Sequence, residues 1–425
     1  VKDKLFFFGY YEGFKRRQAG AQNQTIPATA DLFQGVWRYV STQDGQVRSV
    51  NILQAVGASV DPKMQQDVFS QIPGYTNANN YDRGDSRADR ILNTAAYRWN
   101  QQRMTTRNYV GGRVDFELST NHHFEGVGSY FKETDDRPDL DFISKDRPLA
   151  YTSAPVKRFV GAWRWLVSSR LQNEVRAGAN LAPVRFEVAE GANPTIRFAG
   201  QNANLPLTLQ NPQISFFPQG RYTNTYQLND NASLVWGDHA FQMGASWQRI
   251  RVNPYNYEGT VPTITWGFSS AAPAGAQLNS GMFPGGISAA DLASANTMLS
   301  LLTGTVSSVA RTFQVQDQKS GYVPGIPNNR NYTLDNIAAY IQDNWRLKPN
   351  FTVRAGLKWE YYSPVREDAN LGFLPVLNGR SFESVLRDPN AAITFVNGGL
   401  FKPDRNNFGP TVGFGWDVFK DGRTS

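Results

Sequence analysis

The chain has 425 residues, of which 40% are hydrophobic, 13% are aromatic and only 19% are charged, and it contains no cysteine. Soluble domains usually carry about 25% charged residues, and the sequence has no run of about 18 apolar residues that would form a membrane-spanning helix. The net charge of +7 does not indicate a nucleic-acid-binding protein, because the basic residues are spread singly along the chain.

Alternation of apolar and polar residues predicts β-strands along most of the chain. The run 5–16 and the run 124–132 have strand-like composition, although their faces are ambiguous. The clearest alternation lies in residues 351–362, where apolar Val353, Leu357 and Trp359 are separated by polar or small residues. Similar alternation occurs in residues 107–118, 158–171, 174–181, 221–236, 241–248, 336–347 and 412–418, with Asp343 as an exception to the pattern.

The connections between these runs alternate in length. Short polar turns are expected at Thr120-Asn121, Gln172-Asn173, Gly237-Asp238 and Lys348-Pro349-Asn350, and long stretches at 17–106, 133–157, 187–220, 253–333 and 364–410. Outer-membrane barrels are built this way, with short periplasmic turns and long extracellular loops. We therefore predict an all-β chain, a transmembrane antiparallel β-sheet of about ten strands that is curved as part of a larger barrel.

Two helices are predicted in the long loops. Asp61 and Pro62 are an N-cap and a first-turn proline for a helix over 63–71. Ser288 and Asp291 form a capping box for a helix over 289–302, which Gly304 ends. The stretch 266–286 is rich in small residues and proline, which predicts a flexible segment.

No catalytic or metal-binding constellation is evident, and we predict neither an enzyme nor a bound cofactor. His122, His123 and His239 all fall at predicted periplasmic turns, without a Cys, His or carboxylate partner spaced for a metal site. Four acidic residues fall in the predicted loop 133–157, and a solvated loop is the favoured interpretation over a calcium or cationic-substrate site: they are Asp135, Asp136, Asp139 and Asp141.

Two groups of residues are candidates for function. Charged residues on the polar strand face would face a wet lumen or a plug domain: Arg107, Arg113, Asp115, Glu117, Arg164, Arg354, Lys358 and Glu360. Aromatic residues in the predicted loops could grip a ligand at the mouth of the barrel, or could equally hold the loops together: Trp37, Tyr39, Tyr75, Tyr81, Tyr97, Trp99, Tyr255, Tyr257 and Trp266.

Several segments resemble the Oar-like branch of TonB-dependent outer-membrane receptors. The most specific is Ala339-Tyr340-Ile341-Gln342-Asp343-Asn344-Trp345-Arg346-Leu347, which is similar to a hairpin that these receptors repeat. The run from Lys2 to Gly13, Asp61-Pro62, the segment from Arg113 to His122 and the segment from Gly409 to Asp417 are also similar to that family. The resemblance follows the whole chain in order.

The resemblance implies a 22-stranded barrel with an N-terminal plug, which couples through TonB to the inner-membrane proton gradient. It implies active transport of a large, scarce substrate (a siderophore, vitamin, glycan or peptide) across the outer membrane of a Gram-negative-type bacterium. We expect residues 1–425 to be part of a single barrel domain, a fragment whose plug and C-terminal strands lie outside the chain. The alternatives are a passive, porin-like channel and an adhesive or structural surface protein.

Overall fold

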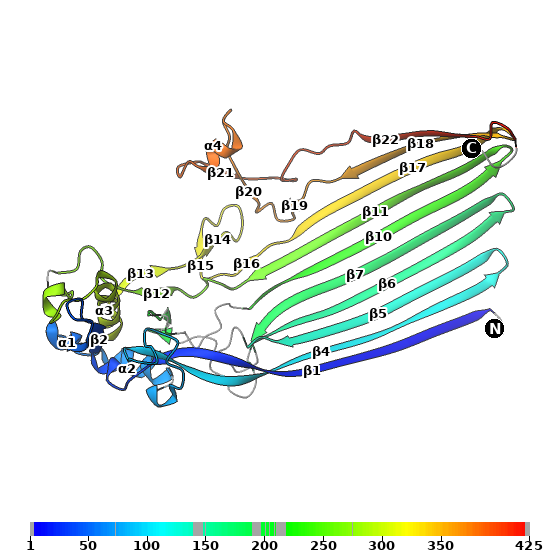
Figure 1. Cartoon of the computed structure of the whole chain (residues 1–425). Helices are drawn as coiled ribbons and strands as arrows, with labels where there is room; N and C mark the ends of the chain where they lie inside the picture. Colours follow the sequence, from blue (N-terminus) through cyan, green and yellow to red (C-terminus); the bar gives the residue numbers. More distant parts are fainter. Residues whose placement is uncertain are drawn as a thin grey trace.

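The computed structural model describes residues 4–72, 74–138, 148, 150–188, 197–199, 201–203, 205–207, 209, 218–273 and 275–420. Ten long strands form one antiparallel sheet in which each strand pairs with its neighbours along this series (Figure 1). They are β1 (Leu5–Pro27), β4 (Thr94–Ser119), β5 (His122–Asp136), β6 (Ala150–Ser168), β7 (Leu171–Val188), β10 (Gln219–Trp236), β11 (His239–Asn256), β17 (Tyr332–Lys348), β18 (Phe351–Tyr362) and β22 (Asn407–Trp416). The predicted fold class and strand number are therefore confirmed.

Smaller elements lie in the long connections. The short strands are β2 (Val36–Val40), β3 (Val47–Asn51), β8 (Arg197–Phe198), β9 (Gln201–Ala203), β12 (Thr263–Trp266), β13 (Val306–Ala310), β14 (Phe313–Gln314), β15 (Val323–Pro324), β16 (Asn328–Asn329), β19 (Arg366–Glu367), β20 (Phe373–Pro375) and β21 (Ile393–Phe395). The α-helices are α1 (Ile52–Ala55), α2 (Pro62–Asp67), α3 (Ala289–Leu302) and α4 (Phe382–Leu386), with single 3₁₀ turns at Leu32–Gln34, Phe69–Gln71, Tyr75–Asn77 and Ser280–Met282. None of the described helices combines the length and apolarity needed to cross a membrane.

Short and long connections alternate as predicted, so β1 begins and β22 ends at the short-turn edge of the sheet (Figure 1). One turn differs from its predicted place. β6 and β7 are joined by Ser169-Arg170, three residues earlier than Gln172-Asn173, because Ser168 Oγ accepts hydrogen bonds from the backbone N–H groups of Arg170 and Leu171 at 3.2 and 3.1 Å. A serine side chain that bonds the backbone two and three residues later fixes a tight turn.

The first hairpin is much longer than the predicted run 5–16. β1 and β4 stay in register from the pair Leu5–Phe116 to the pair Pro27–Thr94. Residues 17–27 are largely polar and extend the ribbon beyond the apolar band, where Gln24 and Ile26 are buried, so the alternation between an apolar and a polar face disappears. Tyr97 and Trp99 therefore lie on β4, and Tyr255 lies on β11, rather than in loops.

The two faces of the sheet differ in chemistry. Residues directly opposite in an antiparallel pair share a face, so the register divides the sheet into two sets. We call one the apolar face; it includes Val110, Val114, Phe116, Leu118, Phe124, Phe159, Trp163, Trp165, Leu228, Met243, Ile337, Ile341, Trp345 and Leu357. The other, the charged face, carries all eight predicted strand-face charges together with Gln227, Asn229, Asn231 and Ser233 of β10.

Aromatic rings gather on the apolar face beside the short turns. The rings of Trp163 and Trp165 stack with centroids 5.5 Å apart, and His239 stacks on Trp345 at 5.1 Å. Such girdles mark the level at which a barrel meets the membrane–water interface, where an amphipathic ring has one side in lipid and one in water. This edge of the sheet therefore lies at an interface.

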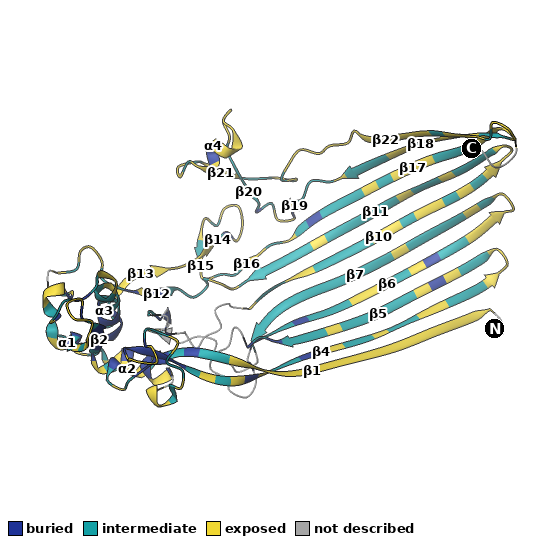
Figure 2. Ribbon diagram, viewed as in Figure 1, coloured by how far each residue is buried: buried dark blue, intermediate teal, exposed yellow. Residues whose placement is uncertain are grey.

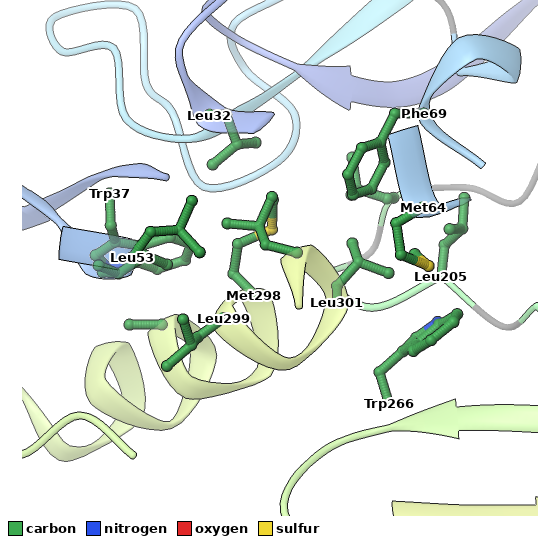
Figure 3. Packing of buried hydrophobic residues seen from close by; sticks show 14 of the residues in the cluster. Leu32, Trp37, Leu53, Met64, Phe69, Leu205, Trp266, Met298, Leu299 and Leu301 are labelled. Atoms are coloured by element: carbon green, nitrogen blue, oxygen red, sulfur yellow. The ribbon is translucent and has the colours of Figure 1, made fainter. Parts of the chain in front are cut away.

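The buried core lies in the loops and not beside the sheet, as Figure 2 shows. We call this body the loop domain; it is built from three segments, 32–72, 198–209 and 264–302. Met64, Met298, Leu299 and Leu301 pack at its centre (Figure 3), where burial of large apolar side chains contributes about 1.5–3 kcal/mol each.

Both predicted loop helices are confirmed. Asp61 caps α2 by accepting from Lys63 and Met64 N–H, and Ser288 caps α3 by accepting from Asp291 N–H. The predicted flexible segment 266–286 is wrong in part, since Leu278 and Phe283 are buried in the loop-domain core. Composition alone missed this because the apolar residues that hold the segment are few and widely spaced.

Candidate functional site: a charged network on one face of the sheet

Glu125 is the centre of a network of charged side chains on strands β4 to β7. Only 8% of this residue is exposed. One of its carboxylate oxygens lies 3.4 Å from Arg113 Nη2 and 3.6 Å from Arg164 Nη2, and the other lies 3.8 Å from Arg176 Nη1. A buried carboxylate is costly unless it is paired, and here three guanidinium groups surround it.

Each arginine also pairs with a second carboxylate. Arg113 Nε lies 2.6 Å from Asp115 Oδ2, and Arg164 Nε lies 2.7 Å from Glu174 Oε2. Arg176 Nη2 lies 3.3 Å from the other oxygen of Glu174. The arrangement alternates positive and negative groups, so no large field of one sign builds up on this face.

The strand register explains why these residues meet. Asp115, Glu125, Ala162 and Arg176 occupy one row across four strands, and Glu117, His123, Arg164 and Glu174 occupy the next row. Asp115 and Glu125 are like charges directly opposite one another, which is unfavourable alone. The long arginine side chains from neighbouring rows offset this repulsion, and the small side chain of Ala162 leaves room for them.

His123 joins the network and corrects one expectation. Its Nδ1 lies 2.6 Å from Glu117 Oε1, and its Nε2 lies 3.5 Å from Asp115. Ligand atoms of Asp115, His123 and Glu125 all lie within 4.8 Å of one another, so a carboxylate pair does accompany this histidine. The arginines already neutralise both carboxylates, however, and a cation placed there would face three guanidinium groups. The chemistry therefore favours a polar contact surface over a metal site.

Of the predicted charged residues, the structure gathers Arg113, Asp115, Glu117 and Arg164 into the network. Arg107 lies closer to the loops, where its Nε is 3.2 Å from Glu133 and its guanidinium covers the Phe14 ring. The three predicted residues of β18 share the face but are separated from the network by β10, β11 and β17: they are Arg354, Lys358 and Glu360. There Lys358 Nζ pairs with Glu360 at 2.7 Å.

Sequence reasoning did not select His123, Glu125, Glu174 and Arg176 as site residues. Glu174 and Arg176 were visible in the alternation of their strand, but nothing in one strand shows which strand lies beside it. Glu125 lies in the run 124–132, where Gly126 and Gly128 replace apolar residues and make the two faces hard to distinguish. The signal available in the sequence was that consecutive hairpins carry charged residues of opposite sign.

The acidic residues of the predicted loop 133–157 divide into two groups. Asp135 and Asp136 are the last residues of β5 and not loop residues. Asp135 pairs with Arg103 and accepts a hydrogen bond from Thr105 Oγ1 at 2.6 Å. Its carboxylate therefore pairs with side chains of β4 rather than forming a cation site. Asp139 and Asp141 lie outside the described residues.

The predicted loop aromatics have different environments. Trp37, Tyr39 and Trp266 are only 2%, 1% and 5% exposed within the loop-domain core, so their side chains pack the loops together and offer no surface to a ligand. Tyr39 also donates from its Oη to the Pro284 carbonyl at 2.7 Å. Tyr75 and Tyr257 are exposed, and the remaining candidates, Tyr81, Tyr97, Trp99 and Tyr255, are half-buried.

Comparison with known proteins gives distant similarity to solved outer-membrane transporters. The ferric-catecholate import receptor Fiu from E. coli K12 is 11% identical over 73% of this chain and 43% of its own, with a TM-score of 0.29. The copper transporter OprC is 8% identical over 93% and 42%, with a TM-score of 0.32, and the outer-membrane transporter YddB from Escherichia coli is 9% identical over 86% and 35%, with a TM-score of 0.33.

The chain therefore spans less than half the length of the solved structures that it matches. No curated protein matches its sequence. The family comparison, in contrast, covers the chain completely, since residues 1–425 match the outer membrane beta barrel domain. An antiparallel sheet with one apolar and one charged face, joined by alternating short turns and long loops, is the structure expected of that family. The chain belongs to the outer-membrane β-barrel domain family and is located in the outer membrane.

Proposed function

We propose that this chain forms barrel strands of a TonB-dependent transporter that imports a large, scarce substrate past a folded plug. The observation that carries the proposal is the charged network around Glu125. Four carboxylates and three guanidinium groups on one face would be very costly in lipid. The charged face is therefore the one that turns toward the barrel lumen.

The mixture of signs favours a protein surface on the other side of the lumen. A pore that selects by charge places a ring of one sign along its path, whereas Asp115, Glu125 and Glu174 alternate here with arginines. Side chains of both signs can pair with the charges of a plug as readily as with each other. Barrels of about 22 strands need such a plug, because barrels of about 16–18 strands already leave an aqueous channel.

Conductance of the full-length protein in a planar bilayer tests this proposal. A plugged transporter should show near-zero conductance, which should rise sharply when the region N-terminal to the barrel is deleted. A large, steady conductance of the intact protein would show a passive, porin-like channel instead. Uptake should also stop in cells that lack TonB.

Paired substitutions test the charged network directly. Arg164→Ala with Glu174→Ala removes a 2.7 Å ion pair from the charged face and should increase leak conductance in the full-length protein. The matched control is Arg249→Ala with Asp335→Ala, which removes a 2.8 Å pair from the opposite face. That control should leave conductance unchanged, and equal leaks in both variants would contradict a role for the network in holding a plug.

A second candidate function is supported by the loop domain. Its three segments share a hydrophobic core, which holds the loops together as one body. A surface that binds other cells or molecules needs such a fixed shape. An adhesive protein would keep its phenotype in cells without TonB, whereas a transporter would lose it. Deleting TonB therefore separates the two functions.

A further inference from the structure

A band of basic side chains borders the apolar face on the side of the long loops. The register places Lys15 of β1, Lys132 of β5, Lys157 of β6 and Arg251 of β11 on the same face as Phe124, Phe159 and Trp247. All four are exposed. Closer to the short turns, the described residues of this face carry no lysine or arginine on β1, β5 and β6, and on β11 they carry only Arg249.

The distance of these cations from the short turns places them at the level of a membrane surface. Lys15 comes ten residues after Leu5, Lys132 ten after His122, and Lys157 eleven before Ser168, each counted from the short-turn end of its strand. A tilted strand needs about 9–11 residues to cross the hydrocarbon layer. The three lysines therefore lie where the apolar band ends, at the level of the lipid headgroups on the side of the long loops, which is the outer leaflet.

These cations have no ion-pair partner in the part of the chain that the structure describes. Among the described residues, no carboxylate lies within ion-pair distance of Lys15, Lys132, Lys157 or Arg251, although nearby basic residues of the same face are paired. Arg249 pairs with Asp335 at 2.8 Å, and Arg185 pairs with Glu187 at 3.5 Å. Within the described part of the chain, the band of basic side chains is thus left with positive charge directed at the lipid.

A groove of about 810 Å³ lies in the apolar face between the lysines and the aromatic girdle. Its floor is formed by the glycines and alanines of four strands, chiefly Gly112, Gly126, Gly128, Gly161 and Ala177, and its walls include Phe159, Leu228 and Trp247. A Cβ added at Gly126 would meet nothing within 4 Å, so the space above that residue is open. Along β5, Gly128 is four residues from Lys132, and along β6, Gly161 is four residues from Lys157.

We propose that this surface binds a phosphorylated lipid of the outer leaflet, with its phosphate on Lys132 and Lys157 and an acyl chain in the glycine-lined groove. Such a lipid has two parts, a compact anion and an apolar chain attached to it. The lysines match the anion, and the groove matches the chain. Lysine suits a phosphate as a flexible point charge. A free anion would use the lysines only and would have no need of the groove.

The test uses the full-length protein in a non-ionic detergent, titrated with diphosphoryl lipid A, with dephosphorylated lipid A and with inorganic phosphate alone, and binding is read by native mass spectrometry. The phosphorylated lipid should bind best. Lys132→Ala with Lys157→Ala should weaken it on the order of tenfold or more, since each basic residue near a membrane surface contributes substantially to anionic-lipid binding. Equal binding of the dephosphorylated lipid, or inorganic phosphate that competes as well as the lipid, would overturn the proposal.

Two further variants keep the test specific. The control Lys319→Ala with Lys348→Ala removes the same charge from a loop and from the short-turn end of β17, and should leave lipid binding unchanged. Gly126→Leu fills the groove and should weaken binding of the lipid without changing the weak binding of inorganic phosphate. A loss of the same size in the control pair, or unchanged lipid binding with Gly126→Leu, would also overturn the proposal. Heat-modifiable migration in gels verifies that each variant is folded.

Discussion

His239 Nδ1 lies 2.6 Å from Asp343 Oδ2 on the apolar face of the sheet, and the histidine ring stacks between Phe241 and Trp345 with centroids 5.6 and 5.1 Å away. Asp343 is the residue that interrupts the alternation of its strand. The register explains the interruption, because Asp343 is opposite Phe241, which is two residue pairs along the ladder from His239 and on the same face. A carboxylate that faces outward is tolerated here since it has a partner and lies beside a short turn.

Removing the histidine should therefore cost more than removing both groups. His239→Ala leaves the Asp343 carboxylate without a partner and should lower the free energy of unfolding by about 1–3 kcal/mol. The double variant His239→Ala with Asp343→Leu should recover most of that loss. Urea unfolding of the full-length protein in lipid vesicles measures both, and additive losses in the double variant would disprove the interaction.

The centre of the charged network should be more sensitive than its edge. Glu125→Gln removes the charge shared by Arg113, Arg164 and Arg176 and should lower stability by about 1–3 kcal/mol. Glu117→Gln, at the more exposed edge, should cost less than about 1 kcal/mol. The same unfolding experiment compares them, and equal losses would show that Glu125 has no central role.

Stability of the loop domain should fall at acid pH through Asp31. Its carboxylate accepts two hydrogen bonds from the Arg38 guanidinium, at 2.7 and 2.9 Å, and this interaction lowers the pKa of Asp31 to about 2. A lowered pKa stabilises the folded state above the unfolded value of 3.8 and loses that contribution as the pH falls from about 4 to about 2. Hydrogen exchange of residues 32–40 should follow this window.

Two variants verify the origin of that pH dependence. Asp31→Asn and Arg38→Gln should each flatten the change in hydrogen exchange between about pH 4 and pH 2, since each removes one half of the pair. An unchanged pH profile in both variants would assign the effect to other groups.

The loop domain should unfold separately from the sheet when its core is damaged. Leu301→Ala removes a fully buried side chain from α3 and should cost about 2–5 kcal/mol. Limited proteolysis of whole cells should then cut residues 257–331 while the membrane strands stay protected. The matched control is Leu386→Ala on α4, whose side chain is 65% exposed and whose loss should leave the cleavage pattern unchanged.

The sequence predicted those features in which short-range chemistry decides the structure. The predicted strand 351–362 and the predicted helix 289–302 have the bounds that the structure gives to β18 and α3. Alternation identified the first, and a capping serine with a following glycine identified the second. Both signals lie within the element itself.

The features that were missed depend on residues far apart in the chain. Tyr39 is buried because it meets Pro284, which is 245 residues away, and no local pattern could distinguish it from an exposed loop tyrosine. Glu125 becomes the centre of a network only when β4, β6 and β7 lie in their observed register. Residues 17–27 of the first hairpin were missed because they lie beyond the apolar band, where a strand does not need to alternate between an apolar and a polar face.

The length of β4 has a mechanical consequence. This one strand begins at Thr94, beside the buried Ala95 and Ala96 at the base of the loop domain, and continues to Arg113 and Asp115 in the charged network. At about 3.3 Å per residue, the twenty residues of β4 from Thr94 to Arg113 measure roughly 60 Å. A pull on the loop domain is therefore carried as tension along the covalent backbone of a single strand, which is hydrogen-bonded to β1 on one side and β5 on the other, to the side chains of the charged network.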